Sequence, residues 1–341
     1  MLRKENRTKP LAEGSYGCIY LEGSAPPCQA DTSPQGRKVR KLLKKEDASV
    51  ELTISKLIKS IPLWDYYFVV QEETGCIEKN FKKARPMYED FCKIYKSSTN
   101  KNLTEIVSPY RGIALRNVTI TEDFSYIESF QHLLTGLSAL HKQGICHFDI
   151  HSGNILEENG YLRYIDFGNA FLGDHINATV VERHNYSFTP DFPTQPPELA
   201  IQNGIHDGLP VDYCVEELAK HRTVFRNGLP YTGISSSYAK NKLALIGSSI
   251  GTTKEEWVAM YRQHWTKFDT WSLGVVFLNI LKQCLLLRSF QPIWKKNQTL
   301  ITTVLRGCLE PHPSCRFSAD EALSYFSSVS VSSSSDTAPP Y

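Results

Sequence analysis

Two acids and an amide stand at close, fixed spacing near the middle of the chain, and this feature constrains the fold most. The stretch "HFDIHSGNIL", residues 147–156, places Asp149 five residues before Asn154 inside an apolar frame. The chain then continues as "NILEENGYLRYIDFGNA", which indicates two short strands joined by a turn at Glu158–Gly160. Asp166 follows the second strand. The sequence therefore predicts that both acids and the amide lie around one short hairpin.

These residue types suit phosphoryl transfer. Mg²⁺ is usually held by one or two carboxylates together with the phosphates of a substrate. Asp166 and Asn154 supply oxygen ligands of this kind, which leaves Asp149 to accept a proton from an attacking hydroxyl. The spacing thus predicts a magnesium-dependent transferase in which Asp149 positions the acceptor.

The two fragments, in this order and at this separation, resemble the catalytic and metal-binding segments of the protein kinase family, H-R-D-x-x-x-x-N and D-F-G. The resemblance implies an α+β, bilobal, protein-kinase-like fold with a small strand-rich N-lobe and a larger, mainly helical C-lobe. It also implies ATP and Mg²⁺ as cofactors, with ATP between the lobes. The substrates it implies are proteins that offer Ser or Thr hydroxyls.

The stretch "LAEGSYGCIY" resembles the glycine-rich phosphate loop of the family, with Gly14 and Gly17 in its second and third glycine positions. Ala12 stands where the first glycine is expected. Glycine there lets backbone N–H groups approach phosphate oxygens. "IVSPYRG" resembles the hinge that meets the adenine edge. The nucleotide-binding residues implied are Leu11, Gly14, Ser15, Tyr16, Gly17 and Ile19 from the loop, and Ser108 and Tyr110 from the hinge.

A lysine that contacts the phosphates is expected on the strand "KVRKLLK", which offers Lys38, Lys41 and Lys44. Side chains two residues apart on a strand share a face. Lys41 shares its face with apolar residues on both sides, so we favour Lys41. Its ion-pair partner is expected to be Glu51, although the gap between them is shorter than is usual in the family. The alternative is that both are solvated charges on a lysine-rich surface.

Three later segments also resemble protein kinases. "TQPPELA" contains Glu198, "FDTWSLG" contains Asp269, and "PSCRFSADEAL" contains Arg316. The resemblance implies a buried pair between Glu198 and Arg316 that anchors the substrate-facing loop. These segments are not expected in small-molecule kinases.

The resemblance also implies boundaries along the chain. A long stretch between Glu198 and Asp269 contains "TKEEWVAMYRQHW", in which Thr253 and Glu256 form a possible capping box. This stretch is interpreted as an inserted helical subdomain, which either contacts a partner or only covers the lobe. Long insertions also occur in kinases of large DNA viruses. The predicted boundaries are an N-terminal extension at 1–10, a kinase domain at 11–326 (N-lobe about 11–110, C-lobe about 111–326, insertion about 203–265), and a disordered Ser-rich tail at 327–341.

Net charge, apolar runs and cysteine spacing indicate which partners and cellular locations to expect. The formal net charge of +2 gives no electrostatic argument for a nucleic acid or a membrane surface. No apolar run reaches the roughly 18 residues of a membrane span, and no apolar run follows the basic start, so neither a span nor a secretory signal is expected. The nine cysteines show no C-x-x-C spacing. Reduced, partly buried thiols in a cytoplasmic or nuclear protein (of a host cell if the protein is viral) are therefore predicted.

Two other functions stay open. The first fragment also resembles small-molecule phosphotransferases of the aminoglycoside and choline kinase type, because His151 falls on the histidine of their H-G-D-x-H-x-x-N motif. A catalytically dead kinase-fold scaffold is the second alternative, against which the presence of Asp149, Asn154 and Asp166 argues. Phe148 stands where many protein kinases have an arginine that reads a phosphate, and is expected to pack beneath the loop instead.

Overall fold

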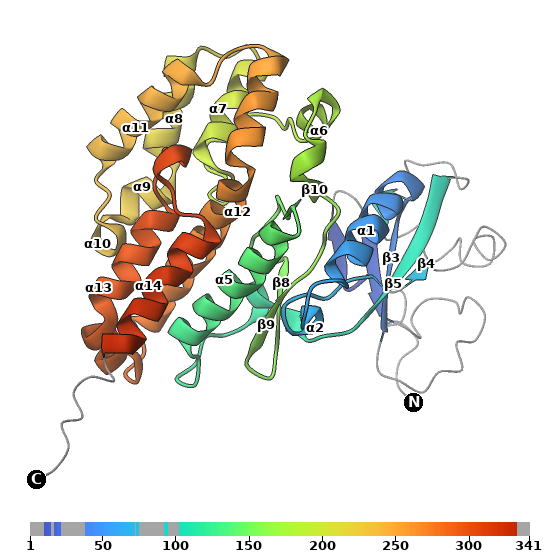
Figure 1. The fold of residues 1–341 in the computed structure, drawn as a ribbon, viewed down its shortest axis with the longest axis horizontal. Coiled ribbons are helices and arrows are strands. Elements are labelled where there is room, and N and C mark those ends of the chain that lie inside the picture. Colours follow the sequence, from blue (N-terminus) through green and yellow to red (C-terminus); the bar gives the residue numbers. More distant parts are fainter. Residues whose placement is uncertain are drawn as a thin grey trace, which may run out of the picture. The chain divides into compact units, whose positions relative to one another are not determined.

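The structure is a computed structural model that describes residues 10–14, 17–21, 38–71, 73–74, 92–94 and 102–332. The chain divides into two compact units. The first unit contains residues 1–112 together with 165–170, and the second contains residues 113–164 and 171–341. The first is rich in strands and the second is mainly helical (Figure 1). The predicted α+β architecture is therefore confirmed.

The first unit contains an antiparallel five-stranded sheet in the order β1-β2-β3-β5-β4. Its strands are β1 (Ala12–Gly14), β2 (Gly17–Leu21), β3 (Lys38–Lys44), β4 (Glu73–Thr74) and β5 (Leu103–Pro109). In the register of the three longest strands, Lys41 on β3 lies opposite Ile19 on β2 and Ile106 on β5. Paired residues point to the same face. Ile19 and Lys41 therefore share one face of the sheet.

Helix α1 (Lys45–Ile58) begins directly after β3, without a connecting loop. It packs on the face of the sheet that carries Lys41, where Leu43, Ala48 and Ile106 form a small buried cluster. A short second helix, α2 (Trp64–Tyr67), follows α1. Because α1 starts so early, its second turn lies close to the middle of β3.

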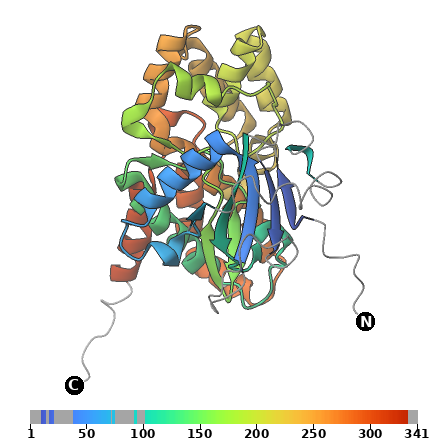
Figure 2. The same ribbon diagram turned by 90° about the vertical axis from the view of Figure 1, so that its right-hand side faces the viewer.

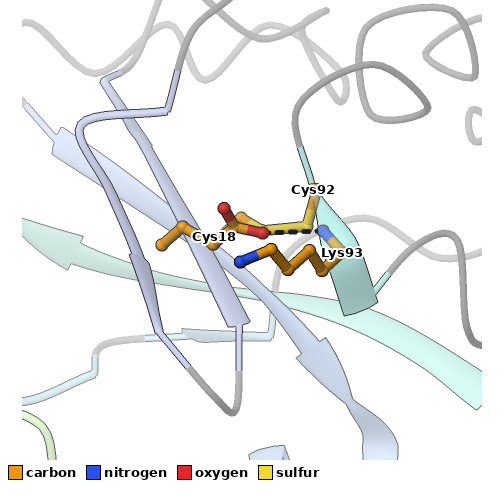
Figure 3. The surroundings of a disulfide bond; sticks show 4 residues. Cys18, Cys92 and Lys93 are labelled. Atoms are coloured by element: carbon orange, nitrogen blue, oxygen red, sulfur yellow. Dashed lines mark hydrogen bonds between the residues drawn. A yellow bond between two sulfur atoms is a disulfide. The ribbon is translucent and has the colours of Figure 1, made fainter.

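The opposite face of the sheet carries a second buried cluster, formed by Cys18, Tyr20, Leu42, Cys92, Ile94 and Leu103. Cys18 on β2 and Cys92 form a disulfide in this cluster (Figure 3). The prediction that the cysteines are reduced thiols is therefore wrong for this pair. The two positions are separated by 74 residues, so the cysteine spacing in the sequence does not indicate this disulfide.

The second unit contains two small antiparallel sheets and most of the helices. The strands form the orders β6-β8-β9 and β10-β7. The strands are β6 (Ile113–Ala114), β7 (Ile145–Cys146), β8 (Ile155–Glu158), β9 (Tyr161–Tyr164) and β10 (Phe171–Leu172). The helices are α5 (Tyr126–Lys142), α6 (Ala178–Arg183), α7 (Pro197–His206), α8 (Val211–His221), α9 (Thr223–Asn227), α10 (Leu229–Thr232), α11 (Ser236–Ser249), α12 (Lys254–Cys284), α13 (Phe290–Cys308) and α14 (Ala319–Ser332). Single 3₁₀ turns occupy Leu115–Asn117, Gly173–His175 and Pro313–Cys315.

The apolar side chains at helical spacing on α5 are fully buried: Phe130, Leu133, Leu134, Leu137 and Leu140. The predicted hairpin is β8–β9, and its turn places Asn159 and Gly160 at φ 55° and 85°. An Asn-Gly pair with positive φ at both positions suits the two-residue turns that match the twist of a hairpin.

The predicted end of the insertion falls within helix α12 (Lys254–Cys284). The predicted capping box of Thr253 and Glu256 is present at its N-terminus. However, the helix then runs without a break over 31 residues to Cys284, so "TKEEWVAMYRQHW" and "FDTWSLGVVF" belong to one helix. Position 265, the predicted end of the insertion, lies inside it. Helices α8 and α11, which precede α12, lie side by side in both views (Figures 1 and 2).

Helix α14 extends to Ser332, past residue 327 where the predicted Ser-rich tail begins, and residues 333–341 lie outside the described residues. The disordered tail stays a prediction. Within the described ranges, none of the helices combines the length and the apolar character that a membrane span needs.

Candidate active site

Lys41 lies in a buried cluster of charges in the first unit. Its Nζ is 2.5 Å from Glu51 Oε1 and 2.8 Å from Asp166 Oδ1. The side chains of Lys41 and Glu51 are only 8% and 1% exposed, whereas Asp166 is a third exposed. Lys38 is half-buried and Lys44 is exposed. Of the three candidate lysines, Lys41 is thus the one that the structure brings to Glu51.

The early start of α1 explains the short gap between the two residues. Glu51 occupies the second turn of a helix that follows β3 directly, so ten residues suffice to bring its carboxylate back to the middle of the strand. Gln71 Nε2 donates a further hydrogen bond of 3.4 Å to Glu51 Oε2. No local pattern in the sequence pointed to Gln71.

The cluster holds one ammonium and two carboxylates, and the pKa shifts reflect this imbalance. Burial raises the pKa of Glu51 to about 7, an effect that Lys41 opposes and Asp166 reinforces. For Lys41, burial lowers the pKa, but Asp166 and Glu51 together raise it above its usual range. Lys41 therefore stays protonated, whereas Glu51 takes up a proton more readily than an ordinary carboxylate.

Gly168 keeps the space beside these carboxylates open. A Cβ at this position would lie 2.9 Å from Glu51 Oε1 and 3.3 Å from Asp166 Oδ1. Gly168 N also donates to Asp166 Oδ1 at 3.3 Å. Asp166 itself has a positive φ of 62°, a conformation that is rare for residues other than glycine and that often occurs at functional sites.

The other predicted nucleotide-binding residues are only partly described. Gly14 pairs with Gly17 at the end of the β1–β2 hairpin, and Ser15 and Tyr16 lie outside the described residues. A Cβ on Gly17 would be 2.4 Å from the carbonyl oxygen of Leu42, so this position requires glycine. The remaining residues are an exposed Leu11 whose N–H bonds the carbonyl of Ile19, a half-buried Ile19 on β2, a buried Ser108 on β5, and a half-buried Tyr110 just after it.

In the second unit, Asp149 and Asn154 lie in direct contact with each other. Asn154 Nδ2 donates to the carbonyl oxygen of Asp149 at 2.9 Å and to its Oδ2 at 3.2 Å. These two bonds fix which edge of the amide faces Asp149, so the amide oxygen faces away from it as a ligand atom. The side chain of Asp149 is about a third exposed, at 32%. A carboxylate in this position can accept a proton from an incoming hydroxyl.

His151 lies beside Asp149. Its Nδ1 accepts a hydrogen bond of 2.9 Å from Gly153 N, and its Nε2 is 3.7 Å from Asp149 Oδ1. Because Nδ1 is an acceptor, a neutral His151 carries its proton on Nε2, toward the acid.

Asp269 fixes the backbone before Asp149. It lies in the middle of α12, is fully buried, and its carboxylate accepts hydrogen bonds of 2.8 Å from both His147 N and Phe148 N. His141 Nε2 lies 3.0 Å from the same carboxylate. Burial would raise the pKa of Asp269, but these partners, His141 foremost, hold it below its usual value. The sequence motif identified Asp269 without indicating this contact.

Phe148 packs in an aromatic cluster, as predicted. Its ring centroid lies 4.3 Å from that of His184, 5.4 Å from Phe171, 5.9 Å from Phe268 and 6.0 Å from Tyr261. Its backbone has a positive φ of 65°. The residue before the candidate base is therefore held by aromatic packing.

The predicted pair of Glu198 and Arg316 is confirmed. Arg316 Nη1 and Nη2 donate to the two oxygens of Glu198 at 2.8 Å and 2.9 Å, and both side chains are buried. Arg316 also donates to the carbonyls of Glu310, Pro311 and Lys267. Such two-pronged contacts are strong and specific in geometry.

The residues present fit a magnesium ion and a nucleoside triphosphate by their chemistry. Asp166 and Asn154 provide hard oxygen ligands, and Lys41 provides a charge for phosphate oxygens. Among the described residues, no group of three or more His, Cys, Asp or Glu is placed to hold a metal by itself.

Comparison with known families gives one match. The family described as "Protein kinase domain" matches residues 13–212, more than half of the chain, with Lys41, Glu51, Asp149, Asn154 and Asp166 inside the matched range. None of the curated proteins matches the chain significantly. The match, the two-unit α+β fold and the order of the motifs agree, and the chain belongs to the protein kinase family.

Proposed function

We propose that this protein kinase is catalytically active, uses ATP and Mg²⁺, and transfers the γ-phosphate to serine and threonine hydroxyls of proteins. The observation that carries the proposal is the contact of Lys41 with both Glu51 and Asp166 in one buried cluster. A scaffold without activity would not need a buried ammonium and two carboxylates, because burying charges costs free energy. This cluster therefore favours activity over a dead kinase-fold scaffold.

Each residue has a distinct proposed role. Lys41, held by Glu51, contacts the phosphates, and Asp166 and Asn154 hold Mg²⁺. The bound Mg²⁺ neutralises charge on the phosphates. Asp149 orients the acceptor hydroxyl and accepts its proton. Serine and threonine are proposed because the loop after Asp149 lacks the A-A-R pattern expected of tyrosine kinases.

The test is transfer of labelled phosphate from ATP to mixed protein acceptors in the presence of Mg²⁺, followed by identification of the phosphorylated amino acid. Asp149→Asn should abolish the transfer and leave the affinity for Mg-ATP nearly unchanged, because the acid contacts the acceptor. Transfer by Asp149→Asn at the unaltered rate would assign the base elsewhere. Phosphotyrosine as the main product would overturn the proposed specificity.

A small-molecule phosphotransferase is the second candidate, and His151 is the observation that favours it. Protein serine/threonine kinases usually have lysine at this place, where it meets the transferred phosphate. Here the histidine beside Asp149 matches the small-molecule branch instead. Choline and an aminoglycoside, offered in parallel with the proteins, separate the two candidates by which acceptor gains label.

Protein acceptors are the proposed partners, and no nucleic acid or membrane is expected. The kinase domain is proposed to span residues 11–326. The helical insertion begins near residue 203 and includes α8–α11. A cytoplasmic or nuclear location stays a prediction.

A further inference from the structure

Arg222 lies in the connection between α8 and α9 and is fully buried. Its backbone is held on both sides, because its N–H donates to Leu218 O while its carbonyl accepts from Phe225 N and Arg226 N. The ring of Phe225 packs against Trp271 of α12 at 5.8 Å between centroids. The base of the Arg222 side chain is therefore rigid.

The guanidinium of Arg222 binds three backbone carbonyls of one segment, residues 190–195. Nε donates to Pro190 O at 2.9 Å, and Nη1 donates to Pro193 O at 3.2 Å and to Gln195 O. Trp271 Nε1 also donates to Pro193 O, at 3.0 Å. This segment leads directly into α7.

Ser272 completes the set of contacts on this segment. Its Oγ donates to Thr194 O at 2.7 Å. The carbonyls of three consecutive residues, 193, 194 and 195, therefore all accept hydrogen bonds from side chains of Arg222, Trp271 and Ser272.

An arginine is a costly choice for stability alone at this position. Burial lowers the pKa of Arg222 to about 9, which Glu198 and Asp191 oppose, so the group keeps its charge at neutral pH. Its Nη2 has no hydrogen-bond partner among the described residues. An apolar side chain of similar volume avoids the cost of desolvating a charge. The hydrogen bonds to three carbonyls therefore explain the presence of an arginine at this position better than packing does.

In the sequence, the segment that Arg222 binds lies between the candidate base Asp149 and helix α7. It is preceded by His184, whose ring contacts Phe148, the residue directly before Asp149. The carbonyls of this segment accept hydrogen bonds from buried side chains, whereas its residues Asp191 and Phe192 are exposed, Phe192 at 46%. A protein that places a hydroxyl at Asp149 must lay its flanking residues over neighbouring surface, and this segment supplies such a surface.

We propose that Arg222 is a positioning residue for the protein acceptor: by holding the carbonyls of residues 190–195, it fixes the surface on which the acceptor lies. The inference rests on the proposed function. Arg222 lies beyond residue 212, where the family match ends. A residue of the predicted insertion thus shapes a segment inside the matched kinase region.

The test compares Arg222→Ala and Arg222→Lys with Arg226→Ala, a control that removes an exposed arginine from α9. Arg222→Ala should lower kcat/KM for a protein acceptor tenfold or more. The KM for Mg-ATP and the rate of ATP hydrolysis without acceptor should stay within twofold, because nucleotide binding does not involve the segment. Hydrogen exchange of the amides of residues 186–195 should accelerate, while that of α5 should not. Arg222→Lys should recover part of the loss, and Arg226→Ala should match the unaltered protein.

Other outcomes overturn the inference in distinct ways. Parallel loss of ATP hydrolysis and acceptor phosphorylation in Arg222→Lys would assign Arg222 to the general stability of the fold. Unchanged acceptor kinetics in both Arg222 variants would show that the segment does not position the acceptor. If Arg222→Ala does not fold, Ser272→Ala tests the same surface, because it deletes a hydroxyl that donates to Thr194 O and, within α12, to Phe268 O. An unchanged KM for the acceptor in this variant would count against the proposal. Failure of the unaltered protein to phosphorylate any protein would overturn the proposed function itself.

Discussion

Asp269 Oδ1 accepts a 2.8 Å hydrogen bond from the backbone N–H of Phe148, the residue directly before Asp149. Asp269, 121 residues further along the chain in helix α12, thereby fixes the backbone beside the candidate base. The same carboxylate also accepts a hydrogen bond from the backbone N–H of His147. The position of Asp149 therefore depends on a buried charge that takes no direct part in the proposed chemistry.

Asp269→Asn should lower both stability and transfer. The amide keeps the shape but loses the charge, and each hydrogen bond to a charged group contributes about 1.5–3 kcal/mol. The folded protein lowers the pKa of Asp269 below its usual value of 3.8. Its contribution is therefore complete above that value and is lost as the pH falls through the lower folded-state pKa. In urea titrations the gap between the two proteins should be constant at neutral pH and should narrow below about pH 4; a constant gap down to pH 2 would contradict this assignment.

Lys41→Met should be the only one of the three lysine substitutions that removes most transfer activity. It deletes the charge proposed to contact phosphate and leaves Glu51 and Asp166 without their shared cation. Removing one group that stabilises developing charge costs about 10²-fold or more in kcat. Lys44→Met is the matched control, since Lys44 is exposed on the same strand. The measurement is the rate of phosphate transfer from labelled ATP in each variant. A greater loss of activity on substitution of Lys44 or Lys38 than of Lys41 would show that another lysine contacts the phosphates.

Reduction of the Cys18–Cys92 disulfide should destabilise the sheet of the first unit. A cross-link over a separation of 74 residues stabilises a protein by about 3–5 kcal/mol in the chain-entropy account. Cys92→Ser should lower the thermal midpoint by the same amount as a reductant lowers it in the unaltered protein. Cys315→Ser is the control, because Cys315 is an exposed free cysteine. Alkylation of Cys18 and Cys92 without prior reduction, detected by mass spectrometry, would show that the bond does not form in solution.

The parts of the molecule that could be predicted are those that local sequence specifies. The Asn159–Gly160 turn and the capping box of α12 each depend on residues a few positions apart. The motifs around Asp149 and Asp166 are equally local. Lys41 could be chosen among its neighbours because a strand alternates between two faces.

The parts that could not be predicted depend on contacts between distant residues. Cys18 and Cys92 carry no spacing signal, and neither does Arg222, whose partners lie 27–32 residues earlier in the chain. The continuity of α12 is hidden for a different reason. Its two halves carry separate sequence motifs, although no proline interrupts the helix between residues 254 and 284.

Phosphatase treatment should leave the rate on an exogenous protein unchanged within about twofold, because residues 184–195 are ordered by packing and hydrogen bonds. His184 contacts Phe148, Gln202 Nε2 donates to Asn185 at 2.7 Å, and Asp207 accepts from Phe188 N at 2.7 Å. Alanine at the exposed Thr179, Ser187 and Thr189, and phenylalanine at Tyr186, should therefore have little effect. Phe148→Arg should reduce the rate strongly, since it places a charge in the aromatic cluster, whereas Phe148→Leu should retain most of it. A tenfold loss after phosphatase treatment, about 1.4 kcal/mol, restored by rephosphorylation, would show that a phosphate orders the segment after all.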